Sequence, residues 1–326
     1  MQGLVTVFGG SGFVGSHIVR ALARRGLRIR VAVRQPGRAY RAPMLGDVGQ
    51  IEVVQANLRD QASVDRALEG AEGCVNAVGV LYESGRQGFE AMHVEGAARV
   101  ARSARAAGAN RLTHISALGA DAGSASAYAR SKAQGEAAVR EAFPEAAVLR
   151  PSVVFGPEDR FFNRFAAMAM ISPALPLIGG GHALMQPVFV ADVGEAAAAS
   201  LIQAEALGRT YELGGPETLS FKALMQLLLA VIQRRRLLIP IPFPVAQLIG
   251  RAGDLAARVG APPPLTLDQV ELLRGDNVVS PDALGLAALG ISANALEPNI
   301  PAYLYRYRPG GQYAGRAEAM ALQAGA

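Results

Sequence analysis

An apolar strand that runs into a glycine turn and then into a helix constrains this chain more than any other feature. The turn lies between an apolar run at 4–8 and a helical pattern at 16–25, and it reads Gly9-Gly10-Ser11-Gly12-Phe13-Val14-Gly15. Gly9 and Gly12 allow a tight turn and close approach of the backbone to a pyrophosphate, and Gly15 lets the helix pack against the strand. The helix N-terminus offers free N–H groups to phosphates. This order predicts dinucleotide binding, against the alternative of an ordinary strand-to-helix turn.

Strand and helix signals alternate along the first 150 residues. We expect strands at 4–8, 28–34, 51–55, 73–78, 112–116 and 147–150, and helices at 16–25, 63–68, 89–107 and 126–142. This alternation predicts an α/β fold with a Rossmann-type doubly wound parallel sheet and helices on both faces. Ligands of such sheets bind at the carboxyl ends of the strands.

The composition of the chain changes after Pro151, where proline and glycine become more frequent. We expect a dinucleotide-binding domain at 1–150 with return elements at about 183–215, a smaller α-rich C-terminal region for substrate or docking at 151–308, and a flexible tail at 309–326. Helices are expected from Asp192, as N-cap, to Ile202, and over 221–232 and 245–259.

Composition and charge exclude several classes of function. The net charge is +5, but the basic residues are scattered apart from Arg234-Arg235-Arg236, so we expect no nucleic-acid binding. The single cysteine, Cys74, is typical of a reducing compartment, and the first strand begins almost at Met1, so we expect a cytoplasmic protein without a signal peptide. Prolines and glycines interrupt the most apolar stretches, which predicts no transmembrane helix. The four histidines lack metal-ligand spacing, so no metal site is expected.

Tyr128 and Lys132 give the strongest chemical signal after the glycine turn. They are four residues apart in an expected helix and therefore share one face. Lys132 and Lys222 are the only lysines in the chain, and arginine could not replace a compact ammonium that bonds ribose hydroxyls beside a phenol. A nearby cation favours phenolate, so Tyr128 is a candidate general acid or base. The alternative is a chance pair on an exposed helix.

The end of the second expected strand indicates which cofactor binds. An acidic residue there would bond the ribose 2′-hydroxyl of NAD. This chain instead has Arg34, and no carboxylate lies between Gly26 and Leu45. A guanidinium can bind a 2′-phosphate through a charge-assisted fork. We therefore expect NADP(H) to be preferred, with NAD(H) as the alternative.

These motifs resemble those of the short-chain dehydrogenase/reductase superfamily, in its extended or atypical branch. The resemblance covers most of the chain, and besides the glycine turn and the Tyr-x-x-x-Lys pair it includes Asn57-Leu58, Asn76-Ala77-Val78-Gly79, Arg150-Pro151-Ser152-Val153-Val154-Phe155-Gly156-Pro157 and Pro187-Val188-Phe189-Val190-Ala191-Asp192-Val193. It implies that Asn57 and Leu58 meet the adenine. It also implies that Ala77, Val78 and Gly79 line the cofactor, and that Pro151 and Val153 meet the nicotinamide.

The chain departs from this superfamily's pattern at the catalytic serine. That serine usually follows the fifth strand by one or two residues, where this chain has Ala117 and Leu118. Ser116 is the nearest hydroxyl, and Ser124 and Ser126 are alternative substitutes. We take Tyr128, Lys132 and Ser116 as the candidate catalytic residues and as cofactor contacts. The departure puts the superfamily's usual carbonyl chemistry in doubt.

A more specific resemblance is to the family of the accessory alpha-subcomplex subunit 9 of respiratory complex I, carried by residues 141–146, 155–163 and 267–279. It implies an NADPH-binding, non-catalytic subunit of the complex I peripheral arm, peripheral on the cytoplasmic face of a bacterial inner membrane. The alternative is an active NADPH-dependent reductase or epimerase on a small carbonyl, sugar-nucleotide or quinone-related substrate. A hydroxyl within hydrogen-bond reach of the Tyr128 oxygen, beside an open cavity, would favour that alternative.

An apolar stripe in the helix expected at 245–259 leaves two interpretations open. It contains Val245, Leu248, Ile249, Leu255 and Val259, and it follows the three arginines at 234–236. The stripe packs on the C-terminal region, as most amphipathic helices do, or it meets a membrane or a partner complex.

Overall fold

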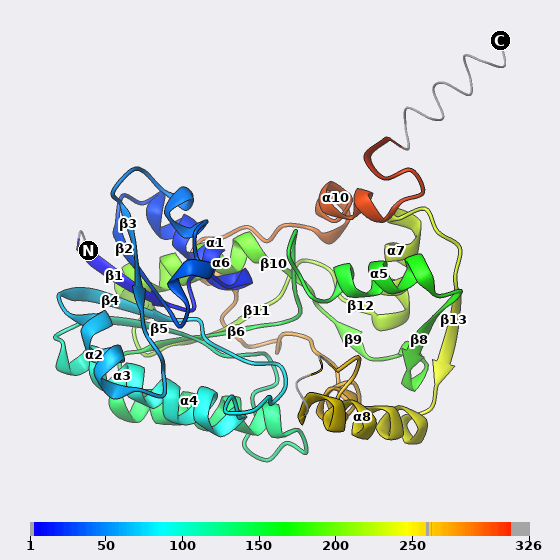
Figure 1. Ribbon diagram of the computed structural model, residues 1–326, viewed down its shortest axis with the longest axis horizontal. Coiled ribbons are helices and arrows are strands. Elements are labelled where there is room, and N and C mark those ends of the chain that lie inside the picture. The colour runs from blue at the N-terminus through cyan, green and yellow to red at the C-terminus, as the bar shows by residue number, and fades with distance from the viewer. Residues whose placement is uncertain (1–2, 259–260, 262, 314–326) are drawn as a thin grey trace, which may run out of the picture.

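Seven parallel strands form the central sheet of the computed structural model, which describes residues 3–258, 261 and 263–313 (Figure 1). The strands, in their order across the sheet, are β11 (Thr210–Leu213), β6 (Ala147–Pro151), β5 (Arg111–Ile115), β4 (Ala71–Asn76), β1 (Leu4–Phe8), β2 (Arg28–Val33) and β3 (Ile51–Gln55). The predicted Rossmann-type parallel sheet is confirmed. Short apolar, β-branched runs such as β1 form the buried strands, because both faces of the sheet are covered.

Helices cover the two faces of the sheet in separate layers (Figure 1). One layer holds α1 (Phe13–Ala23) and α6 (Val190–Ile202), and the other holds α2 (Gln61–Leu68), α3 (Gly96–Ala106) and α4 (Ala127–Ala142). The helices α1 and α6 cross closely, because a side chain at Gly194 would stand 2.7 Å from the His17 carbonyl oxygen. The helix expected at 89–107 is a π-helical segment, Glu90–Glu95, followed by α3.

The C-terminal region has its own apolar core and three small two-stranded sheets. The core lies among α5 (Phe162–Ile171), α7 (Phe221–Val231), α10 (Leu296–Asn299) and α11 (Pro301–Leu304). The strand pairs are β7 (Val154–Phe155) with β10 (Val188–Phe189), β8 (Ala174–Ile178) with β13 (Leu237–Ile241), and β9 (Leu184–Met185) with β12 (Leu219–Ser220). The remaining helices are α8 (Phe243–Arg258) and α9 (Leu267–Leu272), with 3-10 turns at Pro36–Arg38, Ala42–Leu45, Gly179–Gly181, Ala204–Ala206, Leu286–Leu289, Tyr305–Tyr307 and Gly311–Tyr313.

Three expectations need correction or delimitation. Asp192 is not an N-cap: α6 begins at Val190, and the Asp192 carboxylate instead accepts hydrogen bonds from the Asn294 backbone N–H and side-chain amide. The apolar stripe of α8 does not pack inward, because its large side chains face solvent. Val259 and most of the expected tail, 314–326, lie outside the described residues. Among the helices that the structure describes, none has the length and apolarity needed to cross a bilayer.

Candidate cofactor site

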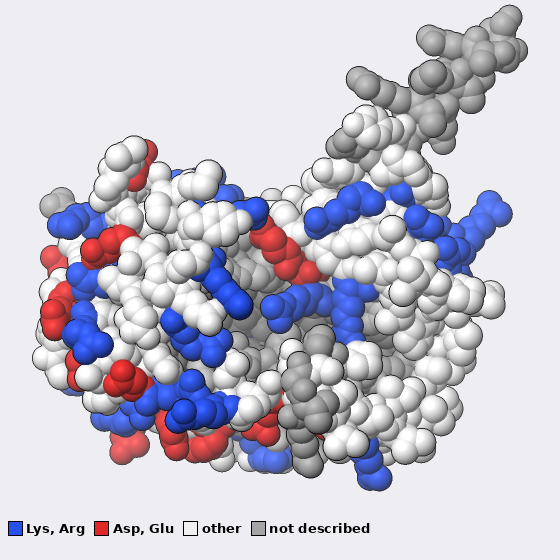
Figure 2. Space-filling model, viewed as in Figure 1, with Lys and Arg blue, Asp and Glu red and all other residues white. Residues whose placement is uncertain are grey.

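The residues expected to bind the cofactor follow the carboxyl ends of adjacent strands. The loops after β1, β2, β3, β4, β5 and β6 carry them, and parallel pairing brings these loops to one edge of the sheet. The strand order reverses between β1 and β4, where ligands of open α/β sheets bind. This edge faces the C-terminal region (Figure 1). Figure 2 shows a hollow between the two parts, with basic side chains on both sides and acidic side chains along its upper rim.

The glycine turn has the geometry of a phosphate cradle. Gly9 has a φ of +77°, which favours glycine. A side chain at Gly15 would stand 2.1 Å from the Gly9 carbonyl oxygen, so only glycine lets α1 approach the turn this closely. Gly12 is the N-cap of α1 and, within the described chain, no side chain caps this helix. The first N–H groups of α1 are therefore available to an anion.

The loop after β4 connects the glycine turn to Lys132. A Cβ at Gly9 would stand 3.1 Å from the Ala77 carbonyl oxygen and 3.2 Å from a Val78 methyl group. At the other end of the loop, a Cβ at Gly79 would stand 3.3 Å from the Lys132 ammonium nitrogen. The turn, the loop and Lys132 therefore form one continuous, tightly packed cradle, in which an added side chain would force its neighbours to shift.

Lys132 and Tyr128 lie together on α4, as their spacing predicts. The Lys132 Nζ is 5.9 Å from the centre of the Tyr128 ring and donates a hydrogen bond to the Ile115 carbonyl oxygen at 3.3 Å. Burial lowers the pKa of Lys132 from 10.5 to about 8. Burial, with the nearby charge of Asp268, raises the pKa of Tyr128 to about 12. The arrangement holds Tyr128 as a neutral phenol at neutral pH.

Ser116 reaches this edge without joining the pair. Its hydroxyl is buried and has no hydrogen-bond partner among the described residues, so it does not bond the Tyr128 oxygen. Ser126, considered as a substitute, is the N-cap of α4, and its hydroxyl oxygen accepts a hydrogen bond from the Ala129 N–H at 3.1 Å. An orphaned buried hydroxyl, free helix N–H groups and a glycine-lined cradle fit a bound dinucleotide.

Asp268 was not among the predicted site residues, yet it contacts the start of α4. Its carboxylate accepts hydrogen bonds from the Ala127 N–H at 2.6 Å, the Tyr128 N–H at 3.3 Å and the Ser126 hydroxyl at 2.8 Å. The capping box between Thr266 and Gln269 gives a sequence signal for the start of α9. No local signal predicts a contact across more than a hundred residues.

His93 is a second residue at this site that the sequence did not indicate. The sequence predicted only a structural or surface role for it. Its Nε2 accepts a hydrogen bond from the Val80 N–H at 3.0 Å, so its Nδ1 donates to the Ser131 hydroxyl at 2.9 Å. The Ser131 hydroxyl donates in turn to the Tyr128 carbonyl oxygen. Burial and the charge of Lys132 lower the pKa of His93 to about 3, which keeps the ring neutral. His93 thus ties the loop after β4 to α4.

Arg34, Asn57 and Leu58, the residues expected at the adenosine end, differ in exposure and in their hydrogen bonds. Arg34 is exposed directly after β2, where the sequence predicts the 2′-phosphate. The Asn57 side-chain oxygen accepts a hydrogen bond from the Arg59 N–H at 3.2 Å, so it is used within its own turn. The Leu58 side chain is buried in the core under α3, and its carbonyl accepts from Arg99.

The segment after α9 holds residues 151–153, where the resemblance implies contact with the nicotinamide. The Asn277 side-chain oxygen accepts hydrogen bonds from the Val153 N–H at 3.2 Å and from the Ser152 hydroxyl at 2.6 Å. Pro151 is buried, and its carbonyl accepts from the Leu118 N–H at 2.9 Å. The Val153 N–H is therefore already used by the protein, and Asn277 is a positioning residue that the sequence did not reveal.

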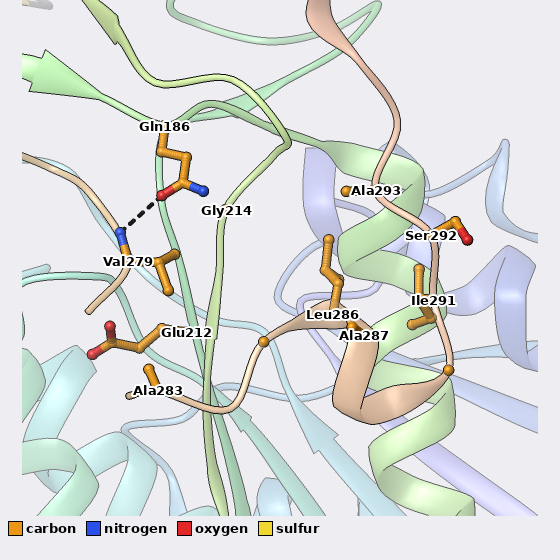
Figure 3. Close-up of a pocket in the computed structure, with 12 residues that line it drawn as sticks. Gln186, Glu212, Gly214, Val279, Ala283, Leu286, Ala287, Ile291, Ser292 and Ala293 are labelled. Atoms are coloured by element: carbon orange, nitrogen blue, oxygen red, sulfur yellow. Dashed lines mark hydrogen bonds between the residues drawn. The ribbon is translucent and has the colours of Figure 1, made fainter. Parts of the chain in front are cut away.

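A separate depression of about 570 Å³ lies beside β11 and the segment 279–293 (Figure 3). None of its lining residues belongs to the predicted site. Its single acid, Glu212, accepts a hydrogen bond from the Ser280 N–H at 2.9 Å, and the Gln186 side chain is held by the Val279 N–H. Its polar groups are thus largely satisfied within the protein, and the cradle at the carboxyl edge remains the candidate site.

Comparisons with known proteins agree with this geometry. Residues 5–214 match the NAD dependent epimerase/dehydratase family. The mitochondrial NADH dehydrogenase (ubiquinone) 1 alpha subcomplex subunit 9 of Arabidopsis thaliana is 34% identical over 320 residues, covering 95% of this chain and 80% of that protein. The ceramide reductase of Caulobacter vibrioides is 40% identical over 177 residues, or 54% of each chain. The structure of Citrobacter sp. triphenylmethane reductase complexed with NADP(H) superposes with a TM-score of 0.70 at 20% identity, covering 92% of this chain and 99% of that one.

Proposed function

The chain belongs to the NAD dependent epimerase/dehydratase family, and from this membership we propose that it is an NADP(H)-binding, non-catalytic accessory subunit of respiratory complex I. The support is twofold. The cradle suits a dinucleotide, and the Arabidopsis relative, a subunit of an NADH dehydrogenase by its name, aligns with almost the whole chain. We also propose, from the sequence resemblance, that the chain joins the peripheral arm of the complex and lies peripherally on the cytoplasmic face of a bacterial inner membrane.

The lack of a serine on the Tyr128 hydroxyl is the observation that carries the proposed non-catalytic role, since the Ser116 hydroxyl bonds no group of the described residues. Acid–base catalysis works best when the pKa of the group lies near the working pH. Here burial and Asp268 raise the pKa of Tyr128 to about 12, and no serine bonds its hydroxyl within the described chain. These features of the site favour cofactor binding without catalytic turnover.

Each part of the proposed cofactor has residues to hold it. The turn at 9–15 would take the pyrophosphate on the α1 N-terminus. Lys132 and Tyr128 would meet the ribose beside the nicotinamide, with the loop 77–79 between them and the turn. Arg34 would take the 2′-phosphate, which is the basis for proposing NADP(H) rather than NAD(H). When bound, the reduced nicotinamide supplies a hydride.

Purification of the native protein in mild detergent tests this function. We expect NADP(H) to be retained in near-stoichiometric amount and subunits of an NADH dehydrogenase to co-purify. Retention of the cofactor by a chain that co-purifies with no respiratory subunit would contradict the accessory role.

A reductase acting on a lipid carbonyl is the second candidate, and one observation favours it. Tyr128 and Lys132 lie together on α4, with the Lys132 Nζ 5.9 Å from the centre of the Tyr128 ring. The Caulobacter relative is by name a ceramide reductase. In such a reaction the Tyr128 hydroxyl would give its proton to the carbonyl oxygen as the hydride adds to the carbon.

Two substitutions separate the candidates. If the pair serves cofactor binding, Lys132→Met weakens NADPH retention by about tenfold or more, because an ammonium hydrogen bond is lost. Tyr128→Phe then leaves retention nearly unchanged, and Lys222→Met is the matched control. Equilibrium dialysis with NADPH measures this. Loss of a defined carbonyl-reducing turnover in Tyr128→Phe would replace the accessory reading with the enzymatic one.

A further inference from the structure

The helix α8 buries its small residues and exposes its large apolar ones, which is the reverse of an ordinary surface helix. Its buried side consists of small residues, Ala246, Gly250, Gly253 and Ala257. Added side chains at the two glycines would stand 2.7 Å from the Leu267 nitrogen and 1.9 Å from the Leu265 oxygen, so α8 lies tightly on the segment that leads into α9. Close packing of the small side leaves the large side chains on the outside.

The outer side of α8 is an aliphatic face. Its members are Val245, Leu248, Ile249 and Leu255, with exposed fractions of 48%, 69%, 43% and 64%. Their spacing of three, four and seven residues puts them on one face of the helix. The strand that leads into α8 adds exposed Leu237 and Ile239. An exposed patch of this kind marks an interaction surface.

The charges around the aliphatic face are arranged for an anionic partner. The acids of this part turn inward: Asp254 accepts a hydrogen bond from the Leu267 N–H, and Glu271 pairs with Arg274 at 2.8 Å and accepts from Gln247. Arg251, on the outer side, is exposed. Figure 2 shows the surface over α8, β8 and β13 largely white, with isolated basic side chains.

The three arginines before β13 offer less free positive charge to a partner than their clustering predicts. The Arg234 guanidinium donates to the Tyr307 carbonyl oxygen, and that of Arg236 donates to the Ala169 carbonyl oxygen. Arg235 is exposed and remains the one of the three that can face a partner.

We propose that the outer face of α8 lies flat on an anionic lipid bilayer, with Val245, Leu248, Ile249 and Leu255 in the acyl boundary and Arg251 among the headgroups. The proposal rests on the proposed function, which places the chain at a membrane, and names the surface that makes the contact. Lipid fits better than protein, since the outer face is aliphatic and carries none of the aromatic anchors that concentrate binding energy at protein interfaces. At sixteen residues, α8 can lie on a bilayer but not span it.

Vesicle flotation of the purified full chain tests the proposal. Wild type floats with vesicles of phosphatidylcholine mixed with phosphatidylglycerol, and floats less with phosphatidylcholine alone. The double variant Leu248→Gln/Leu255→Gln loses at least about tenfold in apparent affinity, because two inserted side chains are gone. Arg251→Gln loses about fivefold for the anionic vesicles. The control Met44→Gln/Val48→Gln changes two apolar residues of the N-terminal part that are more exposed than Leu248 and Leu255, and it floats as wild type.

Three results would overturn the assignment: no flotation of wild type, equal flotation of the double variant, or a wild-type dimer in sedimentation that the double variant abolishes. NADPH content is measured on every variant. Absence of wild-type flotation, in a protein that holds full NADPH and co-purifies with respiratory subunits, refutes the lipid surface alone. Flotation without such subunits refutes the accessory role and leaves the lipid surface standing.

Discussion

Arg34 is the single residue on which the proposed preference for NADP(H) depends. It stands exposed after β2, where an acid would select NAD. We expect Arg34→Ala to weaken NADPH binding by about 1.5–3 kcal/mol, the range for a hydrogen bond to a charged group, and to leave NADH binding unchanged. Isothermal titration with both cofactors measures this. Arg28→Ala, at the opposite end of the same strand, is the control, and equal NADPH affinity of wild type and Arg34→Ala would refute the preference.

Lys132 makes the stability of the empty protein depend on pH. Its pKa is about 8 when folded and 10.5 ordinarily, so between these values the unfolded chain holds a proton that the folded chain has released. This contribution to stability therefore increases as pH rises through that window, and below pH 8 the buried charge carries its full cost. We expect Lys132→Met to be more stable than wild type at pH 7 by up to about 3 kcal/mol, an advantage that fades towards pH 10.5.

Urea unfolding of the cofactor-free protein across this range checks the sign. Lys222→Met is the matched control, because Lys222 is exposed and is the only other lysine. A stability difference between wild type and Lys132→Met that does not change with pH would show that Lys132 is not buried as a charge.

At the scale of the element, substitutions in the glycine turn distinguish effects on stability from effects on NADPH binding. In Gly15→Ala the new methyl meets the Gly9 carbonyl oxygen, so we expect the free energy of unfolding to fall by about 1–3 kcal/mol or more. Gly12 has a φ of −77°, and an added Cβ would stand 3.2 Å from the Gly9 carbonyl oxygen. We therefore expect Gly12→Ala to lose less stability than Gly15→Ala and to lose NADPH affinity, since its methyl group would crowd the phosphate. Gly37→Ala, in open space, changes neither property. Thermal unfolding and NADPH titration distinguish the three, and a normally stable Gly15→Ala would contradict the close packing.

The elements also show which features of the fold local sequence patterns can predict. The glycine turn, the strands up to β6 and the pairing of Tyr128 with Lys132 could be predicted, because each depends on neighbours within a few residues. The inverted α8 could not, since its periodicity gives the apolar side but not the side that the glycines bury. The position of Asp192 in the first turn of α6 was mistaken for the N-cap, because an acid favours both places. Asn277 and Asp268 reach the site only through tertiary contacts.

At the scale of the whole molecule, the Asp268 carboxylate connects the C-terminal region with the start of α4. We expect Asp268→Asn to lower the free energy of unfolding by about 0.5–2 kcal/mol, because the amide is a weaker acceptor for the N–H groups that begin α4. The same change lowers the pKa of Tyr128, since a nearby negative charge is removed. Urea unfolding and an ultraviolet titration against Tyr128→Phe measure the two effects. Glu141→Gln, an exposed acid at the far end of α4, is the control, and an unmoved Tyr128 pKa would contradict the contact.

The Asp268 contact has a consequence for assembly. The short helix α9, which bears Asp268, lies against α8 and bonds the start of α4, so it connects the outer helix with the proposed cofactor site. Coupling of this kind is reciprocal in free energy. We therefore expect a chain loaded with a dinucleotide to bind an outer partner more tightly than an empty chain, which flotation with and without NADPH measures. Assembly of the proposed complex would then select copies that hold the dinucleotide over copies that do not.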